Sequence, residues 1–268
     1  MEDIYSNSRV LPLRGDINFR DFGGYLNSAG RQIKRGGIYR SGSLSALSDA
    51  DMAEISRLGL NRIIDLRSEL EINRGGLDRF YPGNENKYDF LSFGYGDPYL
   101  ADAQVSTELE WDTRQVDFPS IYINMLEQNK PAIRQIFDRF ADPLQYPILI
   151  HCTQGKDRTG IIVALLLLLL EVPRPTILAD YMLTGELIDV NSQLAKFEAY
   201  LREFDELVPQ GITANDWAPF FTCLPRAMEN LFAHLETEYN GVTHFLDSIG
   251  VNRQQRMSIY ENLIENGT

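Results

Sequence analysis

The sequence predicts an α/β fold in which helices flank a central, mostly parallel sheet. Two short apolar runs, within 61–68 and 146–151, have the length and composition of buried strands. A stretch with helical spacing of apolar residues precedes each of them, at about 49–58 and 119–141. This alternation favours parallel strands joined by right-handed crossovers, and in such sheets functional sites form beyond the carboxyl ends of the strands.

Local signals support each of these elements. Ser48 and the acidic residues that follow it suit the start of the first helix, and Gly59 suits its end. In the second helical stretch, Pro131 predicts an interruption. The apolar stretch 160–170 predicts a buried helix, because it is well short of the roughly 20 residues that span a bilayer.

The chain is expected to form one domain over residues 1–268. It has 268 residues, 44% of them hydrophobic, and no linker rich in glycine, serine or proline divides it. Residues 92–118 show no periodicity, and we expect them to form a lid or rim, since long irregular loops are usually functional. Residues 186–268 are expected to form a helical extension.

Composition excludes several classes of protein. A net charge of −13 argues against nucleic-acid binding. The N-terminal residues resemble neither a secretory signal nor a transit peptide, so we expect a cytoplasmic protein without a transmembrane segment. Two cysteines, Cys152 and Cys223, are too few for a disulfide framework, and we expect Cys223 to be a core residue. The three histidines have no zinc-site spacing, so neither a metal nor a cofactor is predicted.

The stretch "HCTQGKDRTG" at 151–160 carries the strongest chemical signal. It follows a predicted strand and precedes an apolar helix, so its backbone N–H groups and the helix dipole converge on one point that suits a phosphate. Arg158 offers a planar fork for two phosphate oxygens. We expect the loop residues to surround the bound phosphate, and these are Thr153, Gln154, Gly155 and Lys156.

In this setting Cys152 is expected to be a thiolate nucleophile that attacks a phosphate monoester without a metal. Asp157 is the candidate for protonating the leaving group and for orienting the water of the second step. Thr159 could donate a hydrogen bond to the sulfur, and His151 could restrain the loop from behind. Lys156 adds a second cation, which suits a substrate with more than one phosphate.

Several of these residues have a second interpretation. A Walker-type nucleotide loop fails because Ile150 and Asp157 occupy positions that it reserves for other residues. Asn18, Arg20 and Asp21 form either a polar network under the loop or a β-turn with a surface ion pair. Asp65 could position Arg158 or the water, or could form an internal ion pair with Arg67. Asp112 is a rival general acid.

Four ordered motifs resemble those of the atypical bacterial and fungal tyrosine phosphatases within the cysteine-dependent phosphatase superfamily. They are "NFRDFGGY" at 18–25, "YRSGSLSALSDAD" at 39–51, "IIDLRSELE" at 63–71 and "HCTQGKDRTG". The similarity covers about residues 12–185. It implies the cysteine-dependent phosphatase fold, with Cys152 as nucleophile, Arg158 as phosphate clamp and Asp157 as acid. It also implies activity toward phosphoinositides, with which Lys156 is associated.

These observations predict a metal-independent phosphatase that acts through a phosphocysteine intermediate on phosphotyrosine proteins. Phosphoinositides or inositol phosphates are the main alternative substrates, and a dual-specificity protein phosphatase is another. A phosphate-binding module without turnover is the alternative from a different class of protein. Arg20 and Asp65 are included with the loop residues as candidate substrate-binding residues.

Overall fold

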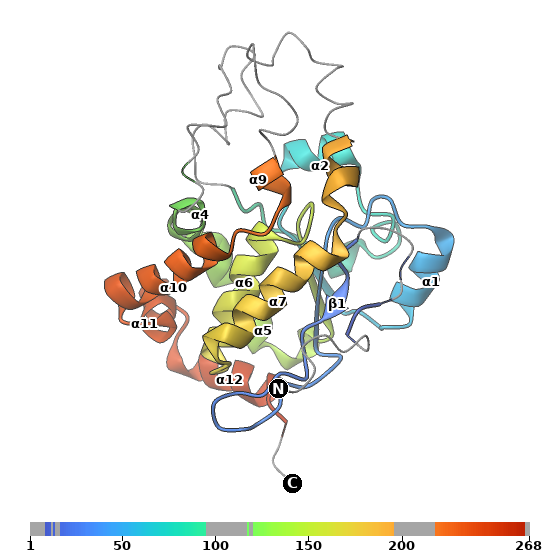
Figure 1. Ribbon diagram of the computed structural model, residues 1–268. Helices are drawn as coiled ribbons and strands as arrows, with labels where there is room; N and C mark the ends of the chain where they lie inside the picture. The colour runs from blue at the N-terminus through green and yellow to red at the C-terminus, as the bar shows by residue number, and fades with distance from the viewer. Residues whose placement is uncertain are drawn as a thin grey trace.

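The computed structural model describes residues 9–11, 13, 17–94, 117, 120–195 and 218–265. The predicted lid or rim at 92–118 lies almost entirely outside the described residues. Asp112, the rival general acid, also lies outside them. The chain traced by these segments is shown in Figure 1.

A five-stranded sheet with the order β1-β2-β5-β3-β4 forms the centre of the described structure. The edge strand β1 (Arg20–Asp21) is antiparallel to β2 (Ile38–Ser41). β2, β5 (Ile148–His151), β3 (Arg62–Asp65) and β4 (Tyr88–Phe90) are all parallel. The predicted mostly parallel sheet is therefore confirmed.

The register of the sheet places three strand ends at one edge. His151, the last residue of β5, pairs with Ser41 of β2 on one side and with Asp65 of β3 on the other. Cys152 follows directly, so the loop that carries it begins in the middle of this edge. The edge is where parallel sheets form their sites.

Apolar residues cover both faces of the sheet. Side chains alternate along a strand, so Ile148 and Ile150 pack in the larger core cluster, whereas Leu149 packs in the smaller one. The smaller cluster includes Ile55 of α1 (Asp49–Ser56), which Ser48 caps with a capping box. The predicted helix over 49–58 is thus confirmed, with its last helical residue at 56.

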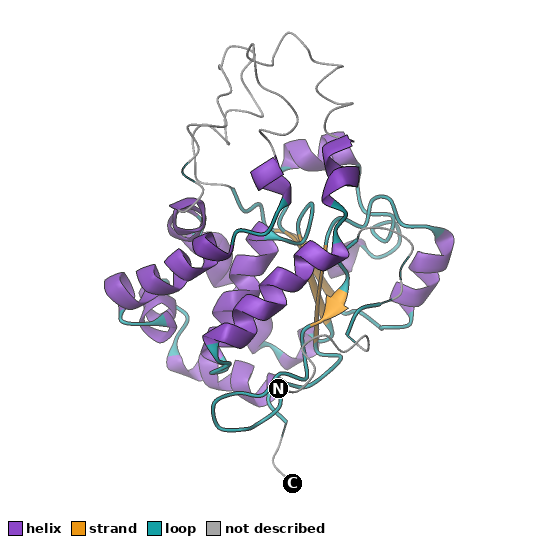
Figure 2. Ribbon diagram, in the orientation of Figure 1, coloured by secondary structure: helices purple, strands orange, loops and turns teal. Residues whose placement is uncertain are grey.

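Most helices lie on the face of the sheet opposite α1 (Figures 1 and 2). The predicted interruption near Pro131 falls at Asn129, between α4 (Ile121–Gln128) and α5 (Lys130–Ala141). α6 (Asp157–Leu169) is buried from Arg158 to Leu167, as its apolar sequence predicts. α7 (Arg174–Leu187) packs against α6.

The C-terminal residues that the structure describes are helical, as predicted. They form α9 (Ala218–Phe221), α10 (Pro225–Tyr239), α11 (Val242–Ser248) and α12 (Arg253–Leu263). Leu231, Phe245 and Ile259 belong to the same core cluster as α6, so these helices are part of the main core. In the described part of the chain, no helix is both long and apolar enough to cross a membrane.

Candidate active site

The loop after β5 has a backbone that requires glycine at one position. Gly155 has a φ of +68°, and a Cβ atom there would lie 2.2 Å from the carbonyl oxygen of Ser41. Both the positive φ and the close approach to β2 exclude a larger side chain. The glycine therefore allows the loop to turn tightly over the strand ends.

Cys152 lies inside this turn and is 3% exposed. The Gly155 N–H donates to its Sγ at 3.2 Å, and α6 begins five residues after it at Asp157. Donors and a helix N-terminus both stabilise negative charge on a sulfur. The geometry fits the nucleophile that the sequence predicts.

Arg158 is fixed by a residue that sequence reasoning missed. Its two terminal nitrogens donate to both carboxylate oxygens of Glu71, at 2.7 and 2.5 Å, and Thr153 Oγ1 donates to Glu71 at 2.6 Å. Burial alone would raise the pKa of Glu71, but the Arg158 charge and hydrogen bonds lower it to about 2. Glu71 also completes the capping box of α2 (Glu69–Gly75) with Ser68, which is the sequence signal that could have drawn attention to it.

Asp157 is the first residue of α6 and is held by hydrogen bonding. The Tyr122 hydroxyl donates to its Oδ1 at 2.5 Å, and the Lys156 ammonium lies 3.6 Å from its Oδ2. Asp157 is thus two residues after the loop glycine and one residue before Arg158. Its placement beside the loop is compatible with the predicted acid.

The side chains of Lys156 and Thr159 do not make the contacts that the sequence predicts for them. Lys156 is 1% exposed, and its ammonium donates to the carbonyl oxygens of Phe220 at 2.5 Å and Thr222 at 2.8 Å. It therefore ties the loop to the C-terminal end of α9 and the residue after it. The buried Thr159 Oγ1 has no hydrogen-bond partner among the described residues, so the predicted bond to the Cys152 sulfur is not formed.

A first group of buried charges lies under the loop beside β2, and we call it the arginine cluster. It consists of Arg20, Arg40 and Asp180. Asp180 of α7 pairs with Arg20 at 3.2 Å and with Arg40 at 2.6 Å, and Arg40 also donates to the Gly155 carbonyl at 2.7 Å. Burial would raise the pKa of Asp180, but the two arginines lower it to about 2.

This cluster corrects the placement of Arg20. Arg20 was expected among the substrate-binding residues, but it is fully buried and its guanidinium is bound by Asp180, Asn18 and Thr184. Burial, then the charge of Arg40, lower its pKa to about 10. Asn18 donates to the carbonyls of Gln154 and Gly155, at 3.0 and 3.1 Å. These residues form the polar network under the loop, which is the first of the two alternatives.

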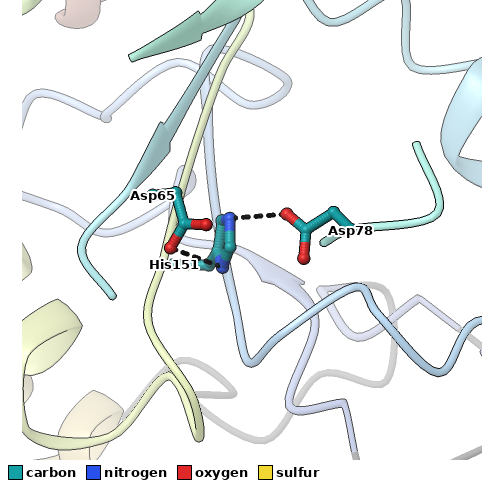
Figure 3. Close-up of side chains that lie close together, drawn as sticks. All are labelled: Asp65, Asp78 and His151. Atoms are coloured by element: carbon teal, nitrogen blue, oxygen red, sulfur yellow. Dashed lines mark ion pairs between the residues drawn. The ribbon is translucent and has the colours of Figure 1, made fainter. Parts of the chain in front are cut away.

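A second group of buried charges lies beside β3, and we call it the histidine cluster. It consists of Asp65, Arg67, Asp78 and His151. The two carboxylates lie on opposite sides of the His151 ring, 3.9 Å from Nδ1 for Asp65 and 3.0 Å from Nε2 for Asp78 (Figure 3). Burial would lower the pKa of His151, but the charges of Asp78 and Asp65 raise it to about 9.

Arg67 and His151 supply the cations that balance this cluster. Arg67 binds Asp65 at 2.7 Å and Asp78 at 2.9 Å, so Asp65 forms the internal ion pair and is fully buried. Of the two alternatives given for Asp65, the structure thus shows the ion pair with Arg67. Three possible ligand atoms of Asp65, Asp78 and His151 lie within 4.8 Å, but a charged imidazole and a guanidinium make this set an ion-pair network.

Taken together, a buried cysteine at a strand end, an N–H donor on its sulfur and an arginine at the second position of the next helix define a cysteine-dependent phosphatase. The profile of the tyrosine phosphatase family matches residues 11–265. The chain therefore belongs to the tyrosine phosphatase family. The match extends through the C-terminal helices, well beyond the 12–185 over which the motifs were recognised.

Curated relatives agree with this assignment. A tyrosine-protein phosphatase of Nostoc commune is 28% identical over 81% of this chain and 70% of its own length. The triple specificity protein phosphatase PtpB of Mycobacterium tuberculosis is 29% identical over 76% of this chain and 79% of its own. A candidate tyrosine-protein phosphatase of Cupriavidus necator is 29% identical over 62% of this chain, and the match spans 59% of that relative.

Proposed function

We propose that this protein is a metal-independent phosphatase that hydrolyses phosphotyrosine in proteins through a phosphocysteine intermediate. The observation that carries the proposal is the loop geometry, in which a buried Cys152 receives an N–H hydrogen bond on its sulfur and Arg158 is held by Glu71. Such a pocket stabilises both the nucleophile and the equatorial phosphoryl oxygens.

In the first step, Cys152 Sγ attacks phosphorus, the S–P bond forms and the bond to the leaving oxygen breaks. Asp157 gives its proton to that oxygen, so the product leaves as a neutral phenol. The loop N–H groups and Arg158 hold the equatorial oxygens, where charge collects in the transition state. The fixed fork of Arg158 suits this task because Glu71 already orders its guanidinium.

In the second step, a water molecule attacks phosphorus and the S–P bond breaks. The carboxylate of Asp157 takes a proton from the water, and the Cys152 thiolate leaves. One residue thus acts as acid and then as base, which microscopic reversibility permits. No step needs a metal ion, because the charged groups of the loop supply the electrostatic stabilisation.

Phosphotyrosine is favoured over more highly phosphorylated substrates by the position of Lys156. Its ammonium, the predicted second cation of the pocket, donates to two backbone carbonyls at the C-terminal end of α9, those of Phe220 and Thr222. The names of the relatives also favour protein phosphotyrosine, although the M. tuberculosis relative is named for triple specificity. We further propose a cytoplasmic location, which the free thiols of Cys152 and Cys223 support.

Initial rates on a panel of substrates test the proposal. The panel contains a phosphotyrosine peptide, phosphoserine and phosphothreonine peptides, and phosphoinositides in detergent, each assayed with reductant and with or without EDTA. We expect the highest kcat/KM on phosphotyrosine, no effect of EDTA, inhibition by vanadate and no turnover by Cys152→Ser. Dominant activity on phosphoinositides or on both peptide classes would support one of the alternative substrates. Phosphate binding without turnover would identify a binding module.

The acid role of Asp157 has its own test within the same assays. Asp157→Asn is expected to lower kcat/KM about 10²-fold or more on phenyl phosphate, whose leaving group needs a proton. The same change is expected to have a much smaller effect on 2,4-dinitrophenyl phosphate, whose leaving group departs as an anion. Equal slowing of both substrates would remove Asp157 from this role.

A further inference from the structure

A chain of hydrogen bonds leads from the backbone near α10 to Asp157. The Leu224 N–H lies 2.6 Å from the Tyr181 hydroxyl, which lies 2.7 Å from the Tyr122 hydroxyl. The Tyr122 hydroxyl lies 2.5 Å from Asp157 Oδ1. The four groups come from the segment before α10, from α7, from α4 and from the first residue of α6, elements that lie together in Figure 1.

The donors and acceptors fix the direction of this chain. A backbone amide can only donate, so the Tyr181 oxygen accepts from Leu224. A hydroxyl has one proton, and the bond between the two hydroxyls uses that of Tyr181, because the Tyr122 hydroxyl donates its own to the Asp157 carboxylate. The Tyr122 proton is in turn directed to Asp157. Every bond in the chain therefore points toward Asp157 Oδ1.

Burial makes the chain rigid. Tyr122 and Tyr181 are 0% and 1% exposed, and their rings pack edge to face with centroids 6.0 Å apart. Gly160 of the loop motif permits this packing, because a Cβ atom there would lie 3.3 Å from the Tyr181 ring. Burial, then the charge of Asp157, raise the pKa of Tyr122 well above its usual value, so its hydroxyl keeps the proton that it donates.

We propose that Tyr122 and Tyr181 are positioning residues for Asp157, which hold one carboxylate oxygen through a hydrogen-bond chain of fixed direction. The proposal rests on the proposed acid role of Asp157. Because Oδ1 receives the Tyr122 hydrogen bond, the proton exchanged with substrate is carried on Oδ2. Tyr122 and Tyr181 do not touch the reacting atoms, so they act only through the placement of Asp157.

The chain also gives the C-terminal segment a place in the active site. Lys156 donates to the carbonyls of Phe220 and Thr222, and Leu224 begins the chain that ends on Asp157. Two adjacent residues, Lys156 and Asp157, are thus both held by residues 220–224. Misplacement of a reacting group by about 1 Å can cost about 10²-fold in rate, so these bonds are expected to influence proton transfer.

The test is the dependence of kcat/KM on the leaving group in Tyr122→Phe. This variant keeps the ring and removes only the hydroxyl. We expect about a tenfold loss of kcat/KM on phenyl phosphate and a loss of less than about twofold on 2,4-dinitrophenyl phosphate. Tyr181→Phe removes the preceding link and should give a smaller loss with the same dependence.

A matched control is Tyr146→Phe, whose hydroxyl donates to the Phe140 carbonyl at 2.6 Å, outside the site. It should change neither rate. A loss of the same size on both substrates in Tyr122→Phe and Tyr181→Phe would overturn the proposal, because a general packing defect does not distinguish leaving groups. If one of the two variants does not fold, the other still tests the proposal.

A double-variant cycle separates this proposal from the acid role itself. Tyr122→Phe should have no further effect on phenyl phosphate in the Asp157→Asn background, because the group that it positions is gone. If Asp157→Asn shows the expected leaving-group dependence but Tyr122→Phe matches the wild type, the acid role stands and the positioning role fails. If Asp157→Asn slows both substrates equally, the acid role fails and the positioning role with it.

Discussion

The two buried charge clusters under the loop differ in charge and in what they hold. The arginine cluster has two guanidinium groups and one carboxylate, a formal balance of +1, and Arg40 bonds directly to the loop carbonyl of Gly155. The histidine cluster has two cations and two anions when His151 is protonated, and it meets the loop at the Cys152 carbonyl, 3.3 Å from His151 Nδ1.

This difference separates two ways of supporting one loop. A loop that turns its N–H groups inward to a phosphate turns its carbonyls outward, and these need buried donors. The arginine cluster supplies such a donor through the Arg40 guanidinium. The histidine cluster is balanced only while one proton is bound, so its contribution depends on pH.

The largest expected effect comes from removing the only carboxylate of the arginine cluster. Asp180→Asn keeps the shape but leaves Arg20 and Arg40 buried without a counter-ion in the cluster. Breaking a buried pair in this way costs about 3–5 kcal/mol, so we expect that loss in the free energy of unfolding, measured with urea. The control is Asp247→Asn, whose half-exposed carboxylate pairs with Arg256 at the surface and should matter by less than about 1 kcal/mol. If Asp180→Asn lowered the free energy of unfolding by less than about 1 kcal/mol, as the control should, the prediction would be contradicted.

A second prediction concerns the pH dependence of folding stability, which should differ between the two clusters. The pKa of His151 is raised from 6.5 to about 9, so its contribution to stability is complete below pH 6.5 and is lost as the pH rises through about 9. The contribution is on the order of 3 kcal/mol. The pKa of Asp180 is lowered from 3.8 to about 2, so its contribution is present above pH 3.8 and is lost as the pH falls through about 2.

Unfolding free energies at pH 6 and pH 9.5 measure the histidine contribution. The wild type should lose stability over this range, and Asp78→Asn should lose markedly less because the first partner of His151 is gone. Asp89→Asn is the control, since Asp89 pairs with Arg139 and Arg62 and should leave the pH dependence unchanged. An unchanged slope in Asp78→Asn would show that His151 is not the group that titrates.

The smallest expected effect concerns activity at constant folding. Arg40→Lys keeps a cation for Asp180 but loses the forked contact that also reaches the Gly155 carbonyl. We expect about a tenfold loss of kcat/KM, which corresponds to about 1.4 kcal/mol. Arg67→Lys is the comparison in the histidine cluster, because Arg67 pairs with Asp65 and Asp78 rather than with a loop carbonyl. It should change kcat/KM, per folded molecule, by less than about threefold. Equal losses would mean that the two clusters do not differ in how they support the loop.

The sequence predicted the central strands and the loop motif because these signals are local. The apolar runs within 61–68 and 146–151 contain β3 and β5. Gly155 has a positive φ, which glycine adopts more readily than any other residue. Of the three residues of one motif that were candidates for the network under the loop, Asn18 and Arg20 belong to it, whereas Asp21 accepts from the N–H groups of Gly23 and Gly36.

Partners that come from distant parts of the chain could not be predicted in this way. Glu71 is 87 residues from Arg158, and Tyr122 is 35 residues from Asp157. The spacing of Tyr122 predicts that it is buried on a helix, but not which polar group its hydroxyl meets. Lys156 shows the same limit, because its carbonyl partners lie at the end of α9 and are 64 and 66 residues away.

The bridge between Ile33 and Ile264 has a consequence for synthesis on the ribosome. Lys34 N–H also bonds to the Leu263 carbonyl, and Glu265 N–H bonds to the Gln32 carbonyl. β5 can pair with β2 and β3 once residue 151 has emerged, but the segment beside β2 lacks these bonds until residues 263–265 follow. A nascent chain can thus pair β2, β5 and β3 early, whereas residues 32–34 gain their backbone partners only after α12 has been translated.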